Sequence, residues 1–325
     1  MGTYKVVRYT PDFYNKWNDF LKVTKNATFL FHRDFMDYHS DRFTDSSLMV
    51  YKKDKLVAVL PANQKGDTIY SHQGLSYGGV VLKSDLKFKD VLYVFYELLK
   101  HLSQQGKDVF ELKLLPQMYS NIPIQEINYI LFILDALVVK KEVLSVIDRK
   151  SPLQISKNRL EGVKRGAKNE LKIVEENTFE GFWNEVLIPN LSKKHNVSPV
   201  HSLAEISDLK RKFPENIKQF NVYHNQKLVA GTTMFLTENV AHCQYISGNS
   251  DKNTLGSLDF LFEHLIKNIF ENKLYFDFGS SNEDNGKKIN TGLQFWKEGF
   301  GARSIVQEFY SVEVGNYKKL KSVII

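Results

Sequence analysis

The segment KIVEE at 172–176, followed by WNEVL at 183–187, repeats a pattern found near the start of the chain. There, KVVRY at 5–9 is followed by WNDFL at 17–21. In both places a β-type segment precedes a segment with helical spacing of apolar residues. A repeat this far apart is domain-sized rather than solenoid-sized. The pattern therefore predicts two copies of one α/β unit.

Two further correspondences follow in the same order. KLVA occurs at 55–58 and again at 227–230, and the apolar helical segment LYVFYELL at 92–99 is matched by LDFLFEHL at 258–265. Four matches in one order, at nearly constant offset, are difficult to obtain by chance. We expect the ligand groove to lie between or within the two units.

The composition is that of an ordinary globular protein, with 42% hydrophobic and 25% charged residues in a chain of 325. The only cysteine, Cys243, excludes disulfides within the chain and gives no support to a zinc cluster, so no metal is expected. No apolar run approaches the roughly 18 residues of a membrane span, and we expect a cytoplasmic protein. The net charge of +7 favours anionic partners such as phosphorylated cofactors, nucleotide-linked sugars or nucleic acid.

The predicted element order is β-α-α-β-β-β-α-β-α-β in each copy. In the first copy the three-stranded meander is expected at 47–52, 56–62 and 68–72. The second copy begins with a basic helix at about 156–169. We therefore predict domains at 1–150 and 151–325, each with a mixed, largely antiparallel sheet flanked by helices, in the α/β (α+β) class.

An antiparallel meander followed by helix, strand, helix and strand resembles the acetyltransferase fold of the GNAT superfamily. Two such units in tandem resemble the Fem family of peptidoglycan aminoacyl transferases and their FemAB-like relatives. Three segments carry this resemblance: FWKEGFG at 295–301, YFDFG at 275–279 and the glycine-containing loop SHQGLSYGG at 71–79. The resemblance covers nearly the whole chain and implies two tandem GNAT-like units.

The resemblance implies an N-acyltransferase that moves an acyl group from acyl-CoA, such as acetyl-CoA, to an amine of an amino sugar or cell-envelope precursor. The sequence departs from the family pattern in two places, so other functions than acyl-CoA-dependent transfer stay open. The loop 248–257 matches the acyl-CoA signature Q/R-x-x-G-x-G/A poorly, and the long coiled-coil arm of many tRNA-dependent Fem enzymes is missing. A Fem-like transferase that uses aminoacyl-tRNA, or a ligand-binding relative without activity, are the alternatives.

The donor phosphates are expected in the second unit, because the loop after its meander leads directly into a helix N-terminus. The predicted donor-binding residues are Ser247, Asn253, Thr254, Gly256 and Lys297. Lys297 lies in the segment that the resemblance places near a donor or acceptor phosphate.

The strand 239–247 is unusually polar for the middle of a sheet. Strict alternation places His242, Gln244 and Ile246 on one face and Cys243, Tyr245 and Ser247 on the other. His242 is a candidate general base, and Gln244 and Tyr245 are candidate catalytic contacts to the substrate. The competing interpretation is a strand whose polar groups bond to neighbouring strands.

The loop 71–79 is the second candidate site. His72 could accept a proton from an amine, Gln73 and Tyr77 could contact the acceptor, and the glycines allow close approach of a ligand. A structural histidine in a glycine-shaped loop is the alternative.

Three further residues are candidates for acceptor binding. His201 precedes a helix expected to be capped by Ser202. Lys164 and Lys168 lie on one face of the basic helix and could bind a diphosphate or an RNA backbone. A solvated basic surface is the simpler interpretation of that helix.

Overall fold

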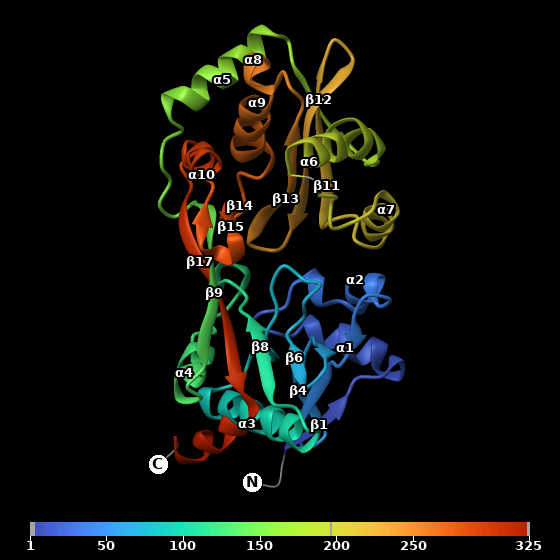
Figure 1. Ribbon diagram of the computed structural model, residues 1–325, viewed down its shortest axis with the longest axis vertical. Helices are drawn as coiled ribbons and strands as arrows, with labels where there is room; N and C mark the ends of the chain where they lie inside the picture. The colour runs from blue at the N-terminus through green and yellow to red at the C-terminus, as the bar shows by residue number, and fades with distance from the viewer. Residues whose placement is uncertain (1–3, 196, 324–325) are drawn as a thin grey trace. The chain divides into compact units, whose positions relative to one another are not determined.

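The computed structural model describes residues 4–195 and 197–323. The chain forms two compact units, one of Met1–Glu142 with Val306–Ile325 and the other of Val143–Ile305. The boundaries fall inside two long strands, β9 (Leu137–Asp148) and β17 (Arg303–Glu313). Each unit is a mixed α/β structure (Figure 1).

The first unit contains an antiparallel sheet in the order β1-β3-β4-β7. Its strands are β1 (Tyr4–Arg8), β3 (Leu48–Lys52), β4 (Lys55–Leu60) and β7 (Val81–Leu82). Helix α3 (Phe88–Gln104) packs against β1 and β3. It does so because its apolar residues recur at helical spacing and are buried: Val91, Leu92, Val94, Phe95, Tyr96, Leu98, Leu99 and Leu102.

The third strand of the first meander is not where the sequence indicated. The segment predicted as strand 68–72 forms β6 (Thr68–Tyr70), which pairs with β5 (Asn63–Lys65) and runs parallel to β8 (Val109–Lys113). The short strand β7 pairs with β4 instead. Pro61 follows β4 directly and cannot donate a ladder hydrogen bond, and the chain makes the excursion 61–80 before it returns.

The rest of the first unit surrounds these strands. Strand order continues as β17-β8-β6-β5-β2, with β2 at Thr44–Asp45. The remaining helical segments are η1 (Pro11–Phe13), α1 (Tyr14–Leu21), η2 (Phe29–Phe31), α2 (Arg33–Met36), η3 (Asp37–His39), η4 (Gln117–Tyr119), α4 (Glu126–Ile133) and η8 (Val314–Ser322).

The second unit contains one sheet in the order β10-β11-β12-β13-β14, closed by the end of β9. Its own strands are β10 (Lys172–Glu176), β11 (Ile217–His224), β12 (Lys227–Leu236), β13 (Val240–Gly248) and β14 (Tyr275–Ser280). Strands β11, β12 and β13 form a three-stranded antiparallel meander like the one expected in each copy, β10 pairs antiparallel with β11, and β13 pairs with β14 in parallel.

Helices cover both faces of this second sheet. On one face α9 (Ser257–His264) and the π-helical turn η6 (Leu265–Ile269) bury Phe262 and Leu265 in an apolar core. On the other face lies the π-helical segment η5 (Phe182–Leu187). The other elements are α5 (Lys157–Lys168), α6 (Ile188–His195), α7 (Leu203–Lys212), α8 (Lys252–Leu255), η7 (Asp284–Gly286), α10 (Thr291–Glu298), β15 (Asn282–Glu283) and β16 (Lys288–Ile289).

The compact units differ from the predicted ranges 1–150 and 151–325. The end of the chain belongs to the first unit because Phe309–Glu313 pairs with Val109–Lys113. Residues 143–148 belong to the second unit because Leu144–Asp148 pairs with β14. Each sheet is thus closed by a strand from the other half of the sequence. Whether 1–150 and 151–325 fold as separate domains stays a prediction.

Candidate functional site

The second sheet opens between its two parallel strands. Strand β13 pairs with β12 along its full length, but it pairs with β14 only through Val240–His242. Strand β14 then turns at Gly279, whose φ of +71° is readily adopted by glycine. Beyond His242, the β14 side of β13 therefore has no ladder partner among the described residues. An unpaired strand edge of this kind can hydrogen-bond an extended ligand.

A β-bulge lies at this opening. Cys243 pairs with Met234 and Tyr245 pairs with Thr233, so Gln244 has no direct partner on β12. A bulge inserts one extra residue into a strand and reverses the alternation of side chains beyond it. The predicted faces are therefore wrong past Gln244.

The contacts beyond the bulge show the reversal. Ile246 packs against the same core as Cys243, although alternation placed the two on opposite faces. On the other face the Tyr245 ring lies 5.1 Å from that of Trp183, and Ser247 Oγ donates to the Val186 carbonyl at 3.3 Å. The buried Ser247 hydroxyl is thus engaged within the protein.

The strands part at a pair formed by His242 and Asp277. The Nδ1 atom of His242 lies 2.9 Å from Oδ2 of Asp277, whose side chain is 1% exposed. The other oxygen, Oδ1, accepts the Gly279 N–H at 2.7 Å. A buried carboxylate held in this way fixes the imidazole orientation and its tautomer. The His242 side chain itself is 19% exposed, so the imidazole is not fully buried.

Lys297 lies beside this pair rather than at the surface. Its Nζ donates to the carbonyls of Gly279 at 3.0 Å and Ser280 at 2.8 Å. Burial lowers the pKa of Lys297 to about 8. Burial also raises the pKa of the neighbouring Cys243 thiol well above its usual value, so this thiol stays protonated near neutrality. Lys297 holds the turn after β14, and a direct contact with a donor phosphate stays a prediction.

Tyr245 and His201, predicted separately, contact each other. His201 Nδ1 lies 2.7 Å from the Tyr245 hydroxyl oxygen, which also accepts the His201 backbone N–H at 3.1 Å. The His201 carbonyl accepts from Trp183 Nε1 at 3.2 Å. Burial raises the pKa of Tyr245 to about 12. This pair attaches the loop before α7 to the sheet, and Ser202 caps α7 with a capping box, as expected.

The first-unit candidates are largely engaged in internal contacts. His72 is 4% exposed, and its Nδ1 accepts the Gly74 N–H at 3.2 Å. Burial, with the stacked His39 ring 5.2 Å away, lowers the pKa of His72 to about 3. A histidine with this pKa is a weak base at neutral pH. Gln73 bonds Asn63, and the buried Tyr77 hydroxyl donates to Thr28 at 3.0 Å.

The expected phosphate loop is covered by another helix. Gly256, in the left-handed region at φ +70°, precedes α9, and a Cβ there would lie 2.1 Å from the Gly162 carbonyl oxygen of α5. Helices α5 and α9 lie side by side (Figure 1). Asn253 and Thr254 are exposed on the short helix α8.

The amides of this loop also bond within the unit. The Asn249 N–H donates to the Val229 carbonyl, and the Asp251 N–H donates to the Asn249 side chain. The free N–H groups that a diphosphate needs are therefore scarce in this loop.

Asp259, in the first turn of α9, is a buried polar residue that was not predicted. Its Oδ1 accepts from Arg159 Nη1 at 2.7 Å and from Trp296 Nε1 at 2.9 Å. An internal carboxylate thus stands where an anionic ligand would otherwise compensate the helix dipole. Burial raises its pKa despite the nearby arginine.

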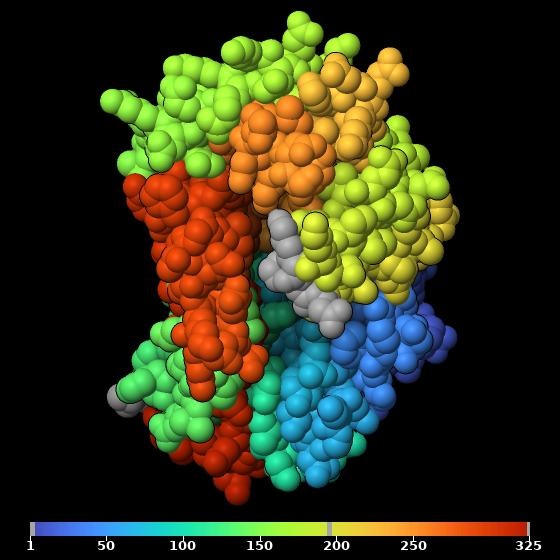
Figure 2. Space-filling model, turned by 45° about the horizontal axis from the view of Figure 1, so that its top comes forward, coloured from blue at the N-terminus to red at the C-terminus, as the bar shows by residue number. Residues whose placement is uncertain are grey.

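The two predicted lysines of α5 are exposed, whereas Arg159 of the same helix bonds Asp259 of α9. Lys164 is 73% exposed and pairs with Glu161 at 2.9 Å, and Lys168 is exposed as well. Figure 2 shows α5 in light green at the surface. Contact of Lys164 and Lys168 with an acceptor stays a prediction.

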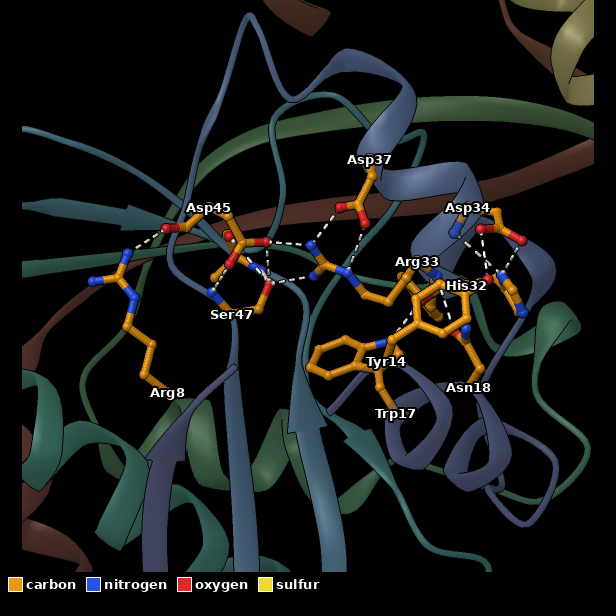
Figure 3. Close-up of polar contacts among 12 residues, drawn as sticks. Arg8, Tyr14, Trp17, Asn18, His32, Arg33, Asp34, Asp37, Asp45 and Ser47 are labelled. Carbon is orange, nitrogen blue, oxygen red and sulfur yellow. Dashed lines mark hydrogen bonds and ion pairs between the residues drawn. The ribbon is translucent and has the colours of Figure 1, made fainter. Parts of the chain in front are cut away.

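A second buried network, also unpredicted, organises the first unit (Figure 3). The guanidinium of Arg33, 3% exposed, pairs with Asp37 and lies 2.8 Å from Asp45 Oδ2. It also lies 3.9 Å from the Tyr9 ring centroid. Its position fixes α2 against the start of β3.

The described residues contain neither a candidate metal site nor a membrane-spanning helix. No cluster of three or more His, Cys, Asp or Glu residues there could hold a metal ion. In the same residues, no helix has the length and apolar character needed to cross a membrane.

The sequence matches no protein-family model and no curated protein. Among solved structures, FemX is similar over 98% of this chain and 99% of its own, with a TM-score of 0.68 and 9% identity. L-PGS from Bacillus licheniformis is similar over 98% of both chains, with a TM-score of 0.60 and 13% identity. The C-terminal domain of a putative lysylphosphatidylglycerol synthetase from Agrobacterium fabrum has a TM-score of 0.55, 13% identity, and coverage of 82% and 84%.

Because the sequence identities are only 9–13%, the similarity shows that the fold is shared and nothing more. It confirms the prediction of two tandem GNAT-like units, and it matches the two mixed sheets described above. The chain has the Fem-type form of the GNAT fold.

Proposed function

We propose that this protein is an acyltransferase of GNAT/Fem type that transfers an acyl group to an amine. The reaction centre is the opening between β13 and β14 in the second unit. The observation that carries the proposal is the His242–Asp277 pair, which stands where the strands part. A histidine oriented by a buried carboxylate is a common general base.

The proposed step is an ordinary aminolysis. The neutral amine attacks the donor carbonyl, and His242 Nε2 takes a proton from its nitrogen as the new C–N bond forms. The tetrahedral intermediate then collapses, the C–O or C–S bond to the donor breaks, and the proton passes to the leaving oxygen or sulfur. Asp277 stabilises the imidazolium between these events. N–H groups on the free edge of β13 are suited to bind the donor carbonyl.

Comparison of the two units favours the second as the donor unit. In the first unit, β8 occupies the place of β14, and its edge on the corresponding side pairs with β6 through Thr68–Tyr70. The Gly78 N–H extends this contact and donates to the Lys113 carbonyl at 2.7 Å. In the second unit, β13 pairs with β14 only through Val240–His242, and beyond His242 this edge of β13 has no ladder partner among the described residues.

Two classes of acyl donor compete for this site. Acyl-CoA, including acetyl-CoA, would need a diphosphate site other than the one expected, because Gly162 and Asp259 fill the start of α9. This observation favours a donor without a diphosphate there, such as the ester of an aminoacyl-tRNA. The exposed lysines of α5 could contact an RNA backbone.

The alternative of a ligand-binding relative without activity is disfavoured, because Asp277 orients the His242 imidazole as a general base requires.

The acceptor is proposed as a primary amine on an amino sugar or cell-envelope precursor, and the location as the cytoplasm. The acceptor rests on the resemblance in sequence motifs, and the location rests on the distribution of apolar residues along the sequence. The name of one structural neighbour includes lysylphosphatidylglycerol, which describes that protein alone.

A transfer screen tests the proposal. The full chain is incubated separately with labelled aminoacyl-tRNA and labelled acetyl-CoA, each with a panel of amino sugars and amino acids. Acid-stable label on an amine is the expected result with at least one donor. Transfer from tRNA alone identifies the ester class, and transfer from acetyl-CoA alone overturns that preference. No transfer from either donor to any amine contradicts the proposed activity.

A further inference from the structure

The first unit contains a cavity of about 290 Å³ that the reaction above does not use. It lies where the end of β6 meets β8, with walls from the first half of β9 and from Phe309–Tyr310 of β17. Strands β6 and β8 are visible side by side in Figure 1. His72 and Gln73 also line the cavity, so part of the loop predicted as a second site contributes to a real pocket.

Glu111 places an uncompensated carboxylate in this cavity. No hydrogen bond or ion pair of its side chain is found among residues 4–195 and 197–323. Burial raises its pKa, which shows that the protein does not offset the cost of its charge. A partly buried carboxylate in such a position is suited to bind a ligand cation.

Lys113 lies two residues after Glu111 on β8, so its side chain is on the same face of the strand, and it also lines the cavity. Its Nζ donates to the Leu75 carbonyl at 2.6 Å, which engages one of its three N–H groups. Burial lowers its pKa to about 8, so the ammonium form still predominates at pH 7. Lys113 and Glu111 form no ion pair with each other in the described structure, although both line the cavity.

The remaining lining side chains are apolar or make polar contacts within the protein, as Ser71, Gln73 and Tyr310 do. Phe309, Tyr70 and Val139 supply apolar surface. Lys140 lies 4.8 Å from the Phe309 ring centroid, but its ammonium pairs with Glu142 at 2.5 Å. The cavity therefore presents one negative group, one positive group and an apolar wall.

We propose that this cavity binds the zwitterion of an α-amino acid. The ammonium group of the ligand pairs with Glu111, its carboxylate pairs with Lys113, and its side chain packs against Phe309. Ligand pockets commonly have volumes of roughly 300–1,000 Å³, so a cavity of 290 Å³ suits a single amino acid better than a nucleotide or a peptide.

Equilibrium binding to the full chain tests this site. The probes are L-phenylalanine, L-leucine and L-lysine, with N-acetyl-L-phenylalanine and L-phenylalaninamide as analogues that each lack one charge. We expect a free amino acid to bind at least about 10-fold more tightly than either analogue, since each charged hydrogen bond contributes about 1.5–3 kcal/mol.

Variants locate the site. Glu111→Gln and Lys113→Met are each expected to weaken binding about 10-fold or more. Lys141→Met is the matched control, because Lys141 lies on β9, is 55% exposed and pairs with Glu308 outside the cavity. Equal binding by the variants and the wild type would place the ligand elsewhere.

Two results would overturn the proposal. One is equal affinity for phenylalanine and N-acetylphenylalanine, which would make this an anion site only. The other is failure of all three amino acids to bind at about 10 mM. The analogue series uses wild-type protein, so it decides the question even if a variant fails to fold. His242→Gln should bind amino acids normally, which separates this inference from the proposed catalysis.

Discussion

Asp277 Oδ2 lies 2.9 Å from His242 Nδ1, and the same carboxylate accepts the Gly279 N–H through its other oxygen. The residue that turns β14 away from β13 therefore also fixes the carboxylate that orients the histidine. Gly279 therefore accounts both for the opening of the sheet and for the orientation of the base, His242.

The role of the Asp277 carboxylate can be tested with a substitution that keeps the size of the side chain. Asp277→Asn keeps the volume but offers the imidazole an amide, which disfavours the tautomer with a proton on Nδ1. We expect the rate of acyl transfer to fall about 100-fold or more, with donor affinity little changed. Single-turnover kinetics and donor titration measure the two separately. A normal rate in Asp277→Asn would show that His242 needs no partner.

The close approach of α5 and α9 depends on a missing side chain. A Cβ at Gly162 would lie 1.8 Å from Asp259 Oδ2 and 2.6 Å from Asp259 Cβ. Gly162→Ala should lower the free energy of unfolding by about 2 kcal/mol, because overpacking outweighs the better helix propensity of alanine. Gly315→Ala is the control, since no atom lies within 4 Å of its added Cβ. Denaturant titration compares the two, and equal stability would mean that α5 can move.

Arg33 should be essential for the stability of the first unit. Arg33→Met leaves the carboxylates of Asp37 and Asp45 beside an apolar side chain (Figure 3). Because the side chains of Asp37 and Asp45 are 45% and 33% exposed, water compensates part of the lost contacts, and we expect a cost of about 1–3 kcal/mol. Arg211→Met, at an exposed pair with Asp208, should change stability by no more than about 0.5 kcal/mol. Thermal unfolding of both variants tests the contrast, and similar melting temperatures would contradict it.

The buried His72 predicts a loss of stability in mild acid. Its pKa is 6.5 unfolded and about 3 folded, so below pH 6.5 the unfolded chain binds a proton that the folded chain does not. The stabilisation is complete above pH 6.5 and is lost as pH falls toward 3. Between pH 7 and pH 5 the loss from this residue is about 2 kcal/mol.

His72→Gln should remove most of that slope. The partly buried His32 and His101 act in the same direction, so the difference between wild type and His72→Gln is the quantity to measure. Lys113 and Lys297 titrate near pH 8 and do not affect this window. Denaturant titrations at pH 5, 6 and 7 give the slopes, and parallel curves for wild type and His72→Gln would refute the assignment.

Regular elements were predictable because their signal is local. The basic helix predicted at about 156–169 matches α5 within a residue at each end. His242 was found because a polar residue in the middle of a strand is conspicuous. Its pairing with Asp277 was not predicted, because the contact between β13 and β14 joins residues 35 positions apart.

Features that depend on pairing could not be read from the sequence. The bulge at Gln244 is set by the register against β12, and strict alternation therefore misplaced Tyr245. Helix α5 packs over Gly256, and no local sequence pattern specifies where that helix packs. The exchange of closing strands has the same origin, since β9 and β17 carry no sign of which sheet they join.

The measurement that tests the central claim most directly is single-turnover acyl transfer by His242→Gln, with the donor and amine identified in the screen. His224→Gln, a histidine on β11 of the same unit, is the matched control. The account predicts a fall of about 100-fold or more for His242→Gln, a wild-type rate for His224→Gln, and equal donor binding by all three proteins. A wild-type rate in His242→Gln would place the reaction centre elsewhere than at the opening of β13 and β14.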